Sequence, residues 1–297
     1  VSRVRITGGE PLVRRGLPEL LGRVASVAGI EEVSLSTNGL LLGALAADLA
    51  RAGLRRVNIS LDTLREGRFR DIAGGASTPA GAPCRTPSER ALAAGADGLH
   101  GVMDGLRAAL AAGLCPVKLN VVVARGLNDD EVPDFVRLAR VLPVHVRFIE
   151  LMPIGWTGFF TPERWVPIDE IKRGCGSLLP LGPGEGPEGS GPAAYFRSPG
   201  AQGTVGFIGA LTEPFCGRCN RVRLTSSGRL LSCLAQEGEG TDLGAMLRAG
   251  ARPELIRAAI REAVRSKPPA SQPPYARDRG PGDLDVRGGR IACPPAR

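Results

Sequence analysis

Residues 33–61, VSLSTNGLLLGALAADLARAGLRRVNISL, carry the two alternating signals that decide the fold. The β-branched runs Val33–Thr37 and Val57–Leu61 are typical of strands, and the turn pair Asn38-Gly39 ends the first of them. Between the runs, Leu41 to Ala52 has apolar residues at helical spacing, and a glycine follows it as expected after a helix. The stretch therefore predicts one strand–helix–strand unit.

The same rhythm extends along the first half of the chain. Further strands are expected at Arg3–Thr7, Val117–Val123 and Val144–Ile149, and further helices at Leu17–Val27, Val102–Ala112 and Glu131–Val141. Strands that alternate with helices favour a parallel sheet with right-handed crossovers. The fold class expected is therefore α/β, with ligands at the carboxyl ends of the strands. After Pro153 the rhythm stops and a less regular region follows.

Length and composition limit the classes of protein. The 297 residues, 43% hydrophobic and 23% charged, suit one large domain or two smaller ones. Because no apolar run approaches about 18 residues, a membrane span is excluded. The net charge of +8 favours anionic partners, but 4% aromatic residues are too few for a base-stacking platform. Nucleic-acid binding is therefore the weakest of the hypotheses considered.

Glycine and proline are concentrated in three stretches. These are Gly74–Gly98, Pro180–Gly203 and Lys267–Arg297, which we expect to be loops or tail because they offer little apolar surface to bury. The division expected is a first region at 1–153 with an insert at 74–98, a second region at 154–266, and a disordered tail at 267–297.

Three of the seven cysteines form a C-x2-C-x13-C arrangement: Cys216, Cys219 and Cys233. The segment between them reads as strand, turn at Ser227-Gly228, and strand, so a hairpin brings the third thiol back toward the first two. Three thiols without a nearby histidine favour an iron–sulfur cluster with one iron open to a ligand. Zinc with a distant fourth ligand and an accidental group of buried thiols are the alternatives.

Two further features suit anionic ligands. Arg221 and Arg223 alternate and so share one strand face, where they would clamp phosphate; a solvated surface pair is the alternative. In Thr7-Gly8-Gly9-Glu10-Pro11, the glycine amides could bind a carboxylate or phosphate and Glu10 an ammonium group, although a plain tight turn explains the glycines equally well. Neither His100 nor His145 has a sequence setting that suggests general-acid work.

Six segments appear together in one known enzyme family. In order they are VRITGGEPLVRRGL, SLSTNGLLL, RVNISLDTL, PVKLNVVV, LPVHVRFIELMP and FCGRCNRVRLTSSGRLLSCL. With them the chain resembles the GTP 3′,8-cyclases of molybdenum cofactor biosynthesis, which are radical S-adenosylmethionine enzymes. The resemblance covers roughly Val1 to Lys267 apart from the two low-complexity inserts.

The resemblance implies an incomplete TIM-type (β/α) barrel with a C-terminal iron–sulfur segment. In the family, one 4Fe–4S cluster binds S-adenosylmethionine and cleaves it to a 5′-deoxyadenosyl radical, which abstracts the 3′ hydrogen of GTP. The carbon radical then attacks C8 of guanine, and the product is (8S)-3′,8-cyclo-7,8-dihydroguanosine 5′-triphosphate. A second 4Fe–4S cluster binds GTP through its open iron.

Site residues follow from the resemblance by position. Gly9, Ser60 and Met152 match contacts of S-adenosylmethionine. The positions matching GTP contacts are Arg5, Ser36, Lys118, Arg221, Val222 and Arg223, with Ser36 where many relatives have threonine. Cys216, Cys219 and Cys233 match the ligands of the second cluster, and Arg147 matches a basic residue near the substrate more loosely. No residue is assigned a catalytic role.

The chain also departs from the family. Relatives carry C-x3-C-x2-C on a preceding strand as ligands of the radical-generating cluster, and these 297 residues contain no such motif. Cys84, Cys115, Cys175 and Cys293 do not have the spacing to replace it. Two hypotheses follow: a cyclase whose start is missing from this sequence, or a truncated, inactive remnant that binds GTP and one cluster.

The resemblance further implies partners and a compartment. We expect GTP as substrate, a homodimer, and cyclic pyranopterin monophosphate synthase as the pathway partner. No membrane or nucleic-acid partner is expected. Thiols and an oxygen-sensitive cluster favour the cytoplasm.

Overall fold

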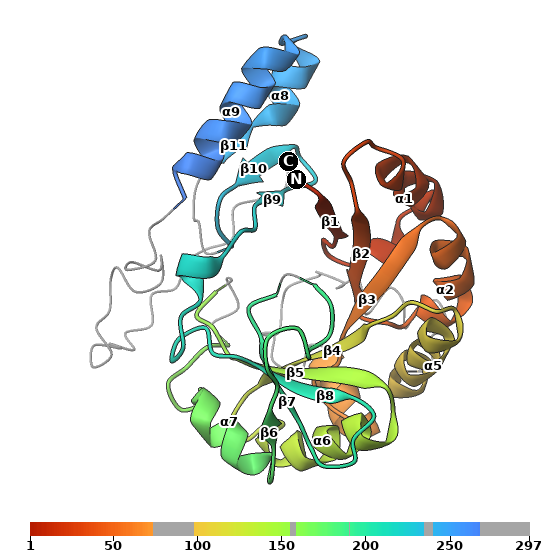
Figure 1. Ribbon diagram of the computed structural model, residues 1–297, viewed down its shortest axis with the longest axis vertical. Helices are drawn as coiled ribbons and strands as arrows, with labels where there is room; N and C mark the ends of the chain where they lie inside the picture. Colours follow the sequence, from red (N-terminus) through yellow and green to blue (C-terminus); the bar gives the residue numbers. More distant parts are fainter. Residues whose placement is uncertain (74–97, 155–158, 190, 235–239, 268–297) are drawn as a thin grey trace. The chain divides into compact units, whose positions relative to one another are not determined.

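The computed structural model of the chain describes residues 1–73, 98–154, 159–189, 191–234 and 240–267 (Figure 1). The insert expected at 74–98 and the tail expected at 267–297 lie outside these residues, except for Gly98 and Lys267 at their edges.

An eight-stranded sheet in the order β1-β2-β3-β4-β5-β8-β7-β6 forms the centre of the fold. The strands are β1 (Arg3–Ile6), β2 (Glu32–Thr37), β3 (Leu54–Ser60), β4 (Val117–Val123), β5 (Val144–Glu150), β6 (Leu179–Pro180), β7 (Ala194–Arg197) and β8 (Thr204–Ile208). Neighbours from β1 to β8 are parallel, whereas β7 and β6 are antiparallel additions at one edge. The parallel order confirms the predicted α/β class.

Helices cover one face of the curved sheet (Figure 1). They are α1 (Leu17–Ala25), α2 (Leu42–Arg51), α3 (Glu66–Ala73), α5 (Gly98–Ala111), α6 (Val132–Val141) and α7 (Ile168–Gly174), with short 3₁₀ turns η1 (Pro11–Val13), η2 (Asp129–Glu131) and η3 (Cys216–Arg218). Among the described residues the sheet stays open, with β1 at one edge and β6 at the other. This arrangement is the incomplete TIM-type barrel that the sequence predicted.

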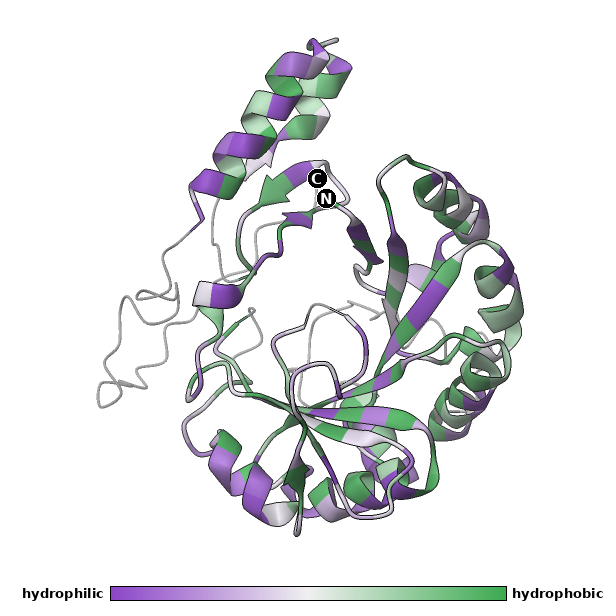
Figure 2. Cartoon of the chain, viewed as in Figure 1, coloured by the Kyte–Doolittle hydropathy of each residue, from purple (hydrophilic) through white to green (hydrophobic). Residues whose placement is uncertain are grey.

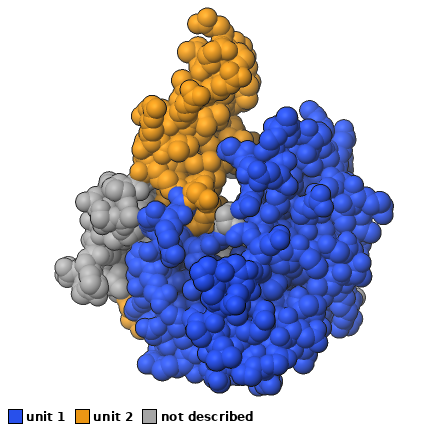
Figure 3. All heavy atoms as spheres, in the orientation of Figure 1, with its two compact units in different colours: residues 1–152, 164–219 blue, residues 153–163, 220–297 orange. Residues whose placement is uncertain are grey.

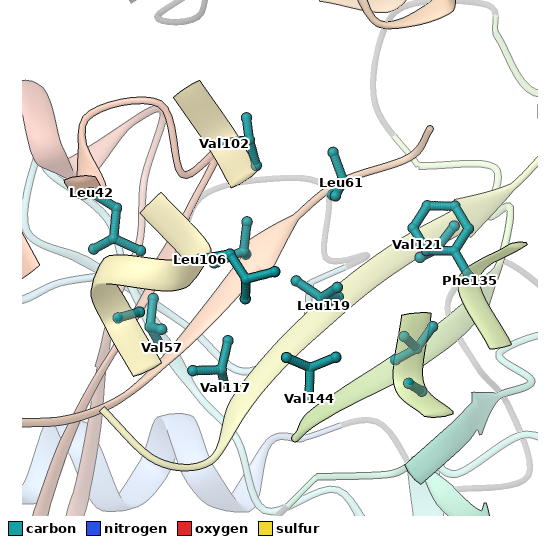
Figure 4. Close-up of a cluster of buried hydrophobic side chains, with 14 of the residues drawn as sticks. Leu42, Val57, Leu61, Val102, Leu106, Val117, Leu119, Val121, Phe135 and Val144 are labelled. Atoms are coloured by element: carbon teal, nitrogen blue, oxygen red, sulfur yellow. The ribbon is translucent and has the colours of Figure 1, made fainter. Parts of the chain in front are cut away.

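The core lies between the sheet and these helices. Successive residues of a strand point to opposite faces, and bands of opposite hydropathy follow one another along β3, β4 and β5 (Figure 2). On the helix side, Val57, Leu119 and Val121 are buried, and they lie near Leu106 of α5 and Phe135 of α6 (Figure 4). Burial of this apolar face fixes the register, because a slip of one residue would turn the polar side chains into the core.

The sheet continues beyond Pro153, where the sequence indicated only irregular structure. β8 pairs in parallel with β5, and all five of its residues are buried. The stretch Pro180–Gly203, expected to be loop, contains β7, which pairs antiparallel with β8. Sequence periodicity misses β8 because Gly206 interrupts its apolar run. A Cβ at Gly206 would lie 2.8 Å from Tyr195 Cε1 of β7, so the close approach of that ring requires glycine there.

Two compact units make up the described chain: unit 1 is Val1–Met152 with Arg164–Cys219, and unit 2 is Pro153–Glu163 with Asn220–Arg297 (Figure 3). Unit 2 contains the antiparallel sheet β11-β10-β9 and two helices. Its elements are β9 (Arg223–Leu224), β10 (Arg229–Leu231), β11 (Thr241–Asp242), α8 (Leu243–Arg248) and α9 (Pro253–Arg265). The predicted hairpin with its turn at Ser227-Gly228 is confirmed, since β9 pairs with β10 and Gly228 has φ 88°. None of the helices in the described residues has the length and apolar character that a membrane span requires.

Candidate functional site

Polar side chains line the face of the unit 1 sheet that points away from the helices. The register aligns Ser36, Asn58, Lys118, His145 and Thr204 across five neighbouring parallel strands. Arg56 lies two residues before Asn58 on β3, and Arg147 lies two residues after His145 on β5, so both share this face. We call Arg5, Arg56, Lys118 and Arg147 the cationic group.

Three members of the cationic group are buried: Arg56 is 3% exposed, and Lys118 and Arg147 are each 4% exposed. Arg56 forms an ion pair with Glu32 of β2. Lys118 Nζ and Arg56 Nη1 each donate to the backbone carbonyl of Glu188, both at 2.6 Å. Two side chains from β3 and β4 therefore converge on one oxygen of the segment that precedes β7.

A hydrogen-bonded chain connects the other polar residues of this face. Arg147 Nη2 donates to Asn58 Oδ1 at 2.8 Å, and Asn58 Nδ2 donates to Ser36 Oγ at 3.2 Å. Asn58 is 1% exposed, so this amide holds the Arg147 guanidinium in a fixed place relative to β2 and β3. Arg5 Nε donates to Ser34 Oγ at 3.5 Å on the adjacent strand.

The cations of this face depress one another's proton affinity. Burial, together with the positive charges of Arg147, Arg56 and Arg5, lowers the pKa of Lys118 to about 7. Burial and the charge of Lys118 likewise lower the pKa of His145 to about 4, and its Nδ1 lies 2.8 Å from Thr204 Oγ1. His145 is therefore neutral at pH 7, so the positive charge of this face comes from lysine and arginine.

Two buried polar atoms on this face fit an added anionic or polar ligand. Arg56 Nε and Asn120 Oδ1 have no hydrogen-bond partner among the described residues. A buried donor or acceptor without a partner is costly, and native proteins normally satisfy it with protein, water or ligand. Together with the cationic group, these atoms make the face suitable for phosphate, which accepts several charge-assisted hydrogen bonds.

The residues matched to S-adenosylmethionine lie at the carboxyl edge of the same sheet. Gly9 follows β1, Ser60 ends β3, and Met152 follows β5. Glu10 differs from the ammonium acceptor suggested by the sequence: its buried carboxylate accepts from Thr37 Oγ1, from the Asn38 amide, both at 2.7 Å, and from the Leu12 amide. The glycine turn is thus fastened to β2 through Glu10.

The residues matched to GTP are divided between the two units. Arg5, Ser36 and Lys118, with Arg147, lie on β1, β2, β4 and β5 in unit 1. Arg221, Val222 and Arg223 lie at the start of the hairpin in unit 2, where Val222 packs against the small core formed by Leu230, Leu243 and Ala263. The structure brings the first set onto one face.

The three cysteines sit at two ends of the hairpin segment. Cys216 begins η3 and the Cys219 amide donates to the Cys216 carbonyl at 3.1 Å, so these two thiols bracket one tight turn. In unit 2, extending the pairing of Leu231 with Arg223 places Cys233 opposite Arg221, two residues after Cys219 in the chain. Within the described residues no set of three or more His, Cys, Asp or Glu side chains is gathered as a metal site. The three-thiol ligand set therefore stays a prediction.

Sequence reasoning did not identify Arg56 or the Glu188 carbonyl as parts of the site. Arg56-x-Asn58-x-Ser60 alternates with buried Val57 and Ile59, and this period of two was the available signal for Arg56. The Glu188 carbonyl had no signal, because a backbone oxygen carries no sequence identity.

Comparisons with known proteins agree with this arrangement. The model of the radical SAM superfamily matches residues 1–139, and the Molybdenum Cofactor Synthesis C model matches residues 144–273. The chain is 48% identical over 268 residues to the GTP 3′,8-cyclase of Moorella thermoacetica, which covers 90% of this chain and 76% of that protein. It is 47% identical to that of Pelotomaculum thermopropionicum, with the same coverage of 90% and 76%, and 44% identical to that of Gloeobacter violaceus, covering 94% and 79%.

Proposed function

The chain belongs to the GTP 3′,8-cyclase family of the radical S-adenosylmethionine superfamily, and on this premise we propose that it binds GTP and converts it to (8S)-3′,8-cyclo-7,8-dihydroguanosine 5′-triphosphate in molybdenum cofactor biosynthesis. The observation that carries the proposal is the buried cationic group on the inner face of the sheet. Its positive charge suits a triphosphate, which presents several anionic oxygens.

The proposed substrate contacts follow from position on that face. Lys118 and Arg147 would bind the phosphates, with Ser36 and Arg5 beside them on β2 and β1. Asn58 holds Arg147 through its Oδ1, so the guanidinium is positioned before the nucleotide arrives. Arg221, Val222 and Arg223 are the proposed contacts from unit 2.

The family implies 4Fe–4S clusters and S-adenosylmethionine as cofactors. When bound, a cluster of this superfamily supplies the electron that cleaves S-adenosylmethionine. In this chain, Cys216, Cys219 and Cys233 are the proposed ligands of one cluster, and thiolates are the ligands that iron–sulfur clusters take. Gly9, Ser60 and Met152 would contact S-adenosylmethionine at the carboxyl edge of the sheet, where parallel α/β folds bind ligands.

The finer assignments of partners belong to the same proposal. They are a homodimer, consumption of the product by cyclic pyranopterin monophosphate synthase, and the cytoplasm as compartment, which suits thiolate-bound iron.

The test uses the 297-residue chain, reconstituted anaerobically with iron and sulfide. We expect about four irons per chain, as for one three-cysteine motif, and saturable GTP binding. Cys219→Ser should lose iron and weaken GTP binding, whereas Cys115→Ser, an exposed thiol, should change neither.

Incubation with GTP, S-adenosylmethionine and a reductant separates the two hypotheses about this chain. Cyclised nucleotide in the mass spectrum would support the cyclase. Bound GTP without product would favour the inactive binding protein, consistent with the absence of C-x3-C-x2-C from these residues. A colourless product that ignores GTP would contradict both.

A further inference from the structure

The segment Gly182–Gly189 places backbone against the cationic group. The Glu188 carbonyl accepts from Lys118 Nζ and from Arg56 Nη1, at 2.6 Å each. Gly189 approaches so closely that a Cβ there would lie 2.0 Å from Arg56 Nη1. A neutral carbonyl thus receives two charged donors, a place that an anionic oxygen would fill with stronger hydrogen bonds.

The known contacts of Arg56 leave part of its guanidinium unused. Its ion pair with Glu32 involves Nη2, and the Glu188 carbonyl occupies Nη1. Arg56 Nε is buried and has no partner among the described residues. An arginine that offers two nitrogens on one edge is suited to bidentate contact with phosphate.

The electrostatics of the face also favour an added anion. Arg147, Arg56 and Arg5 all act on Lys118 to lower its pKa, so these four cations are close enough to repel one another. Glu32 acts in the opposite direction on Lys118 but carries only one negative charge. Buried charge that exceeds its counter-charge is costly, and a bound polyanion would remove that cost.

We propose that Arg56 is a further phosphate-binding side chain of this site, and that the Glu188 carbonyl occupies the place of a phosphate oxygen until the nucleotide displaces it. The inference rests on the proposed GTP function and adds a residue and a competing segment to it. Glycines at 182, 184, 186 and 189 give the segment the backbone freedom that displacement requires. The apparent affinity for GTP is then reduced by the fraction of molecules in which the carbonyl is in place.

The first experiment separates phosphate binding by Arg56 from a purely structural role beside Glu32. Binding of GTP and of guanosine is measured by anaerobic equilibrium dialysis on the reconstituted chain, for Glu32→Gln and for Glu32→Gln combined with Arg56→Met. The paired change avoids leaving a buried carboxylate alone. We expect the double variant to bind GTP roughly tenfold to a hundredfold more weakly than Glu32→Gln, the range for a charged hydrogen bond, with guanosine affinity unchanged.

Equal GTP affinity of the two variants would overturn the role of Arg56 while leaving the proposed function intact. Failure of the unsubstituted chain to bind GTP would instead remove the proposed function and this inference with it. Circular dichroism of each variant shows whether it is folded before its affinity is compared.

A second variant tests the displacement directly. Gly189→Ala puts a methyl group into the Arg56 guanidinium at a residue with φ 123°, so it disfavours the arrangement with the carbonyl in place. We expect GTP to bind more tightly, by roughly tenfold, and guanosine to bind as before. Gly184→Ala is the matched control, because φ is 85° there but no atom lies within 4 Å of the added Cβ. Unchanged or weaker GTP binding by Gly189→Ala would refute displacement.

Discussion

Lys118 shows at the scale of one residue how the site stores an electrostatic cost. Its ammonium is buried beside three arginines, and its pKa is lowered to about 7 from a model value of 10.5. In the folded protein the group gives up its proton more readily than in the unfolded chain. The free energy of unfolding therefore rises with pH between about 7 and 10.5, and the cost of the charged form is greatest below 7.

This shift predicts proton uptake when GTP binds above pH 8. Phosphates beside Lys118 favour its charged form, whereas most of the free protein at that pH carries a neutral amine. We expect uptake of up to about one proton per GTP and an affinity that falls as pH rises from 7 to 9, a range in which the phosphates no longer titrate. Calorimetry in buffers of different ionisation enthalpy measures the uptake.

Lys118→Met should abolish that uptake, and Lys172→Met, a lysine on α7 paired with Glu213, should retain it. If both variants and the unsubstituted chain take up the same number of protons, the lowered pKa of Lys118 does not contribute to binding.

At the scale of elements, close packing of α5 against the turn after β2 is set by glycine. A Cβ at Gly105 would lie 2.4 Å from the backbone carbonyl of Gly39, a contact that requires the helix to move. Gly22 in α1 has no such constraint, because its added Cβ would meet its nearest atom, the Ala52 carbonyl oxygen, at 3.8 Å.

The two glycines predict opposite effects of one substitution. Gly105→Ala should lower the free energy of unfolding by about 1–3 kcal/mol through overpacking. Gly22→Ala should raise it by about 0.5–1 kcal/mol, because alanine favours the helix. Urea denaturation followed by circular dichroism measures both, and a stabilising Gly105→Ala would show that α5 does not sit this close to the turn.

For the whole molecule, the two units differ in how much apolar surface they bury. The core of unit 1 draws on most of its strands and helices, whereas that of unit 2 has Leu230, Leu243 and Ala263 as its buried members. Stability rises with buried apolar area, so unit 2 should open more readily than unit 1.

Hydrogen exchange tests that difference. We expect amides of β10 to exchange at least roughly tenfold faster than those of β4 in the iron-free chain. If Cys233 ligates a cluster, reconstitution should slow exchange in β10 while leaving β4 unchanged, since ligand binding stabilises the unit that holds it. Equal protection of the two strands in the iron-free chain would contradict the ranking.

The sequence by itself determined the parallel strand–helix plan, because a period of two in strands and of 3.6 in helices is local and readable. It also indicated Arg5, Ser36, Lys118 and Arg147, through their place in or beside recognisable strands. Tertiary structure alone decided that Thr204–Ile208 joins the sheet beside β5 and that Arg56 shares an oxygen with Lys118. Strand pairing and a backbone carbonyl placed against distant side chains depend on residues far apart in the chain, and no local pattern records such contacts.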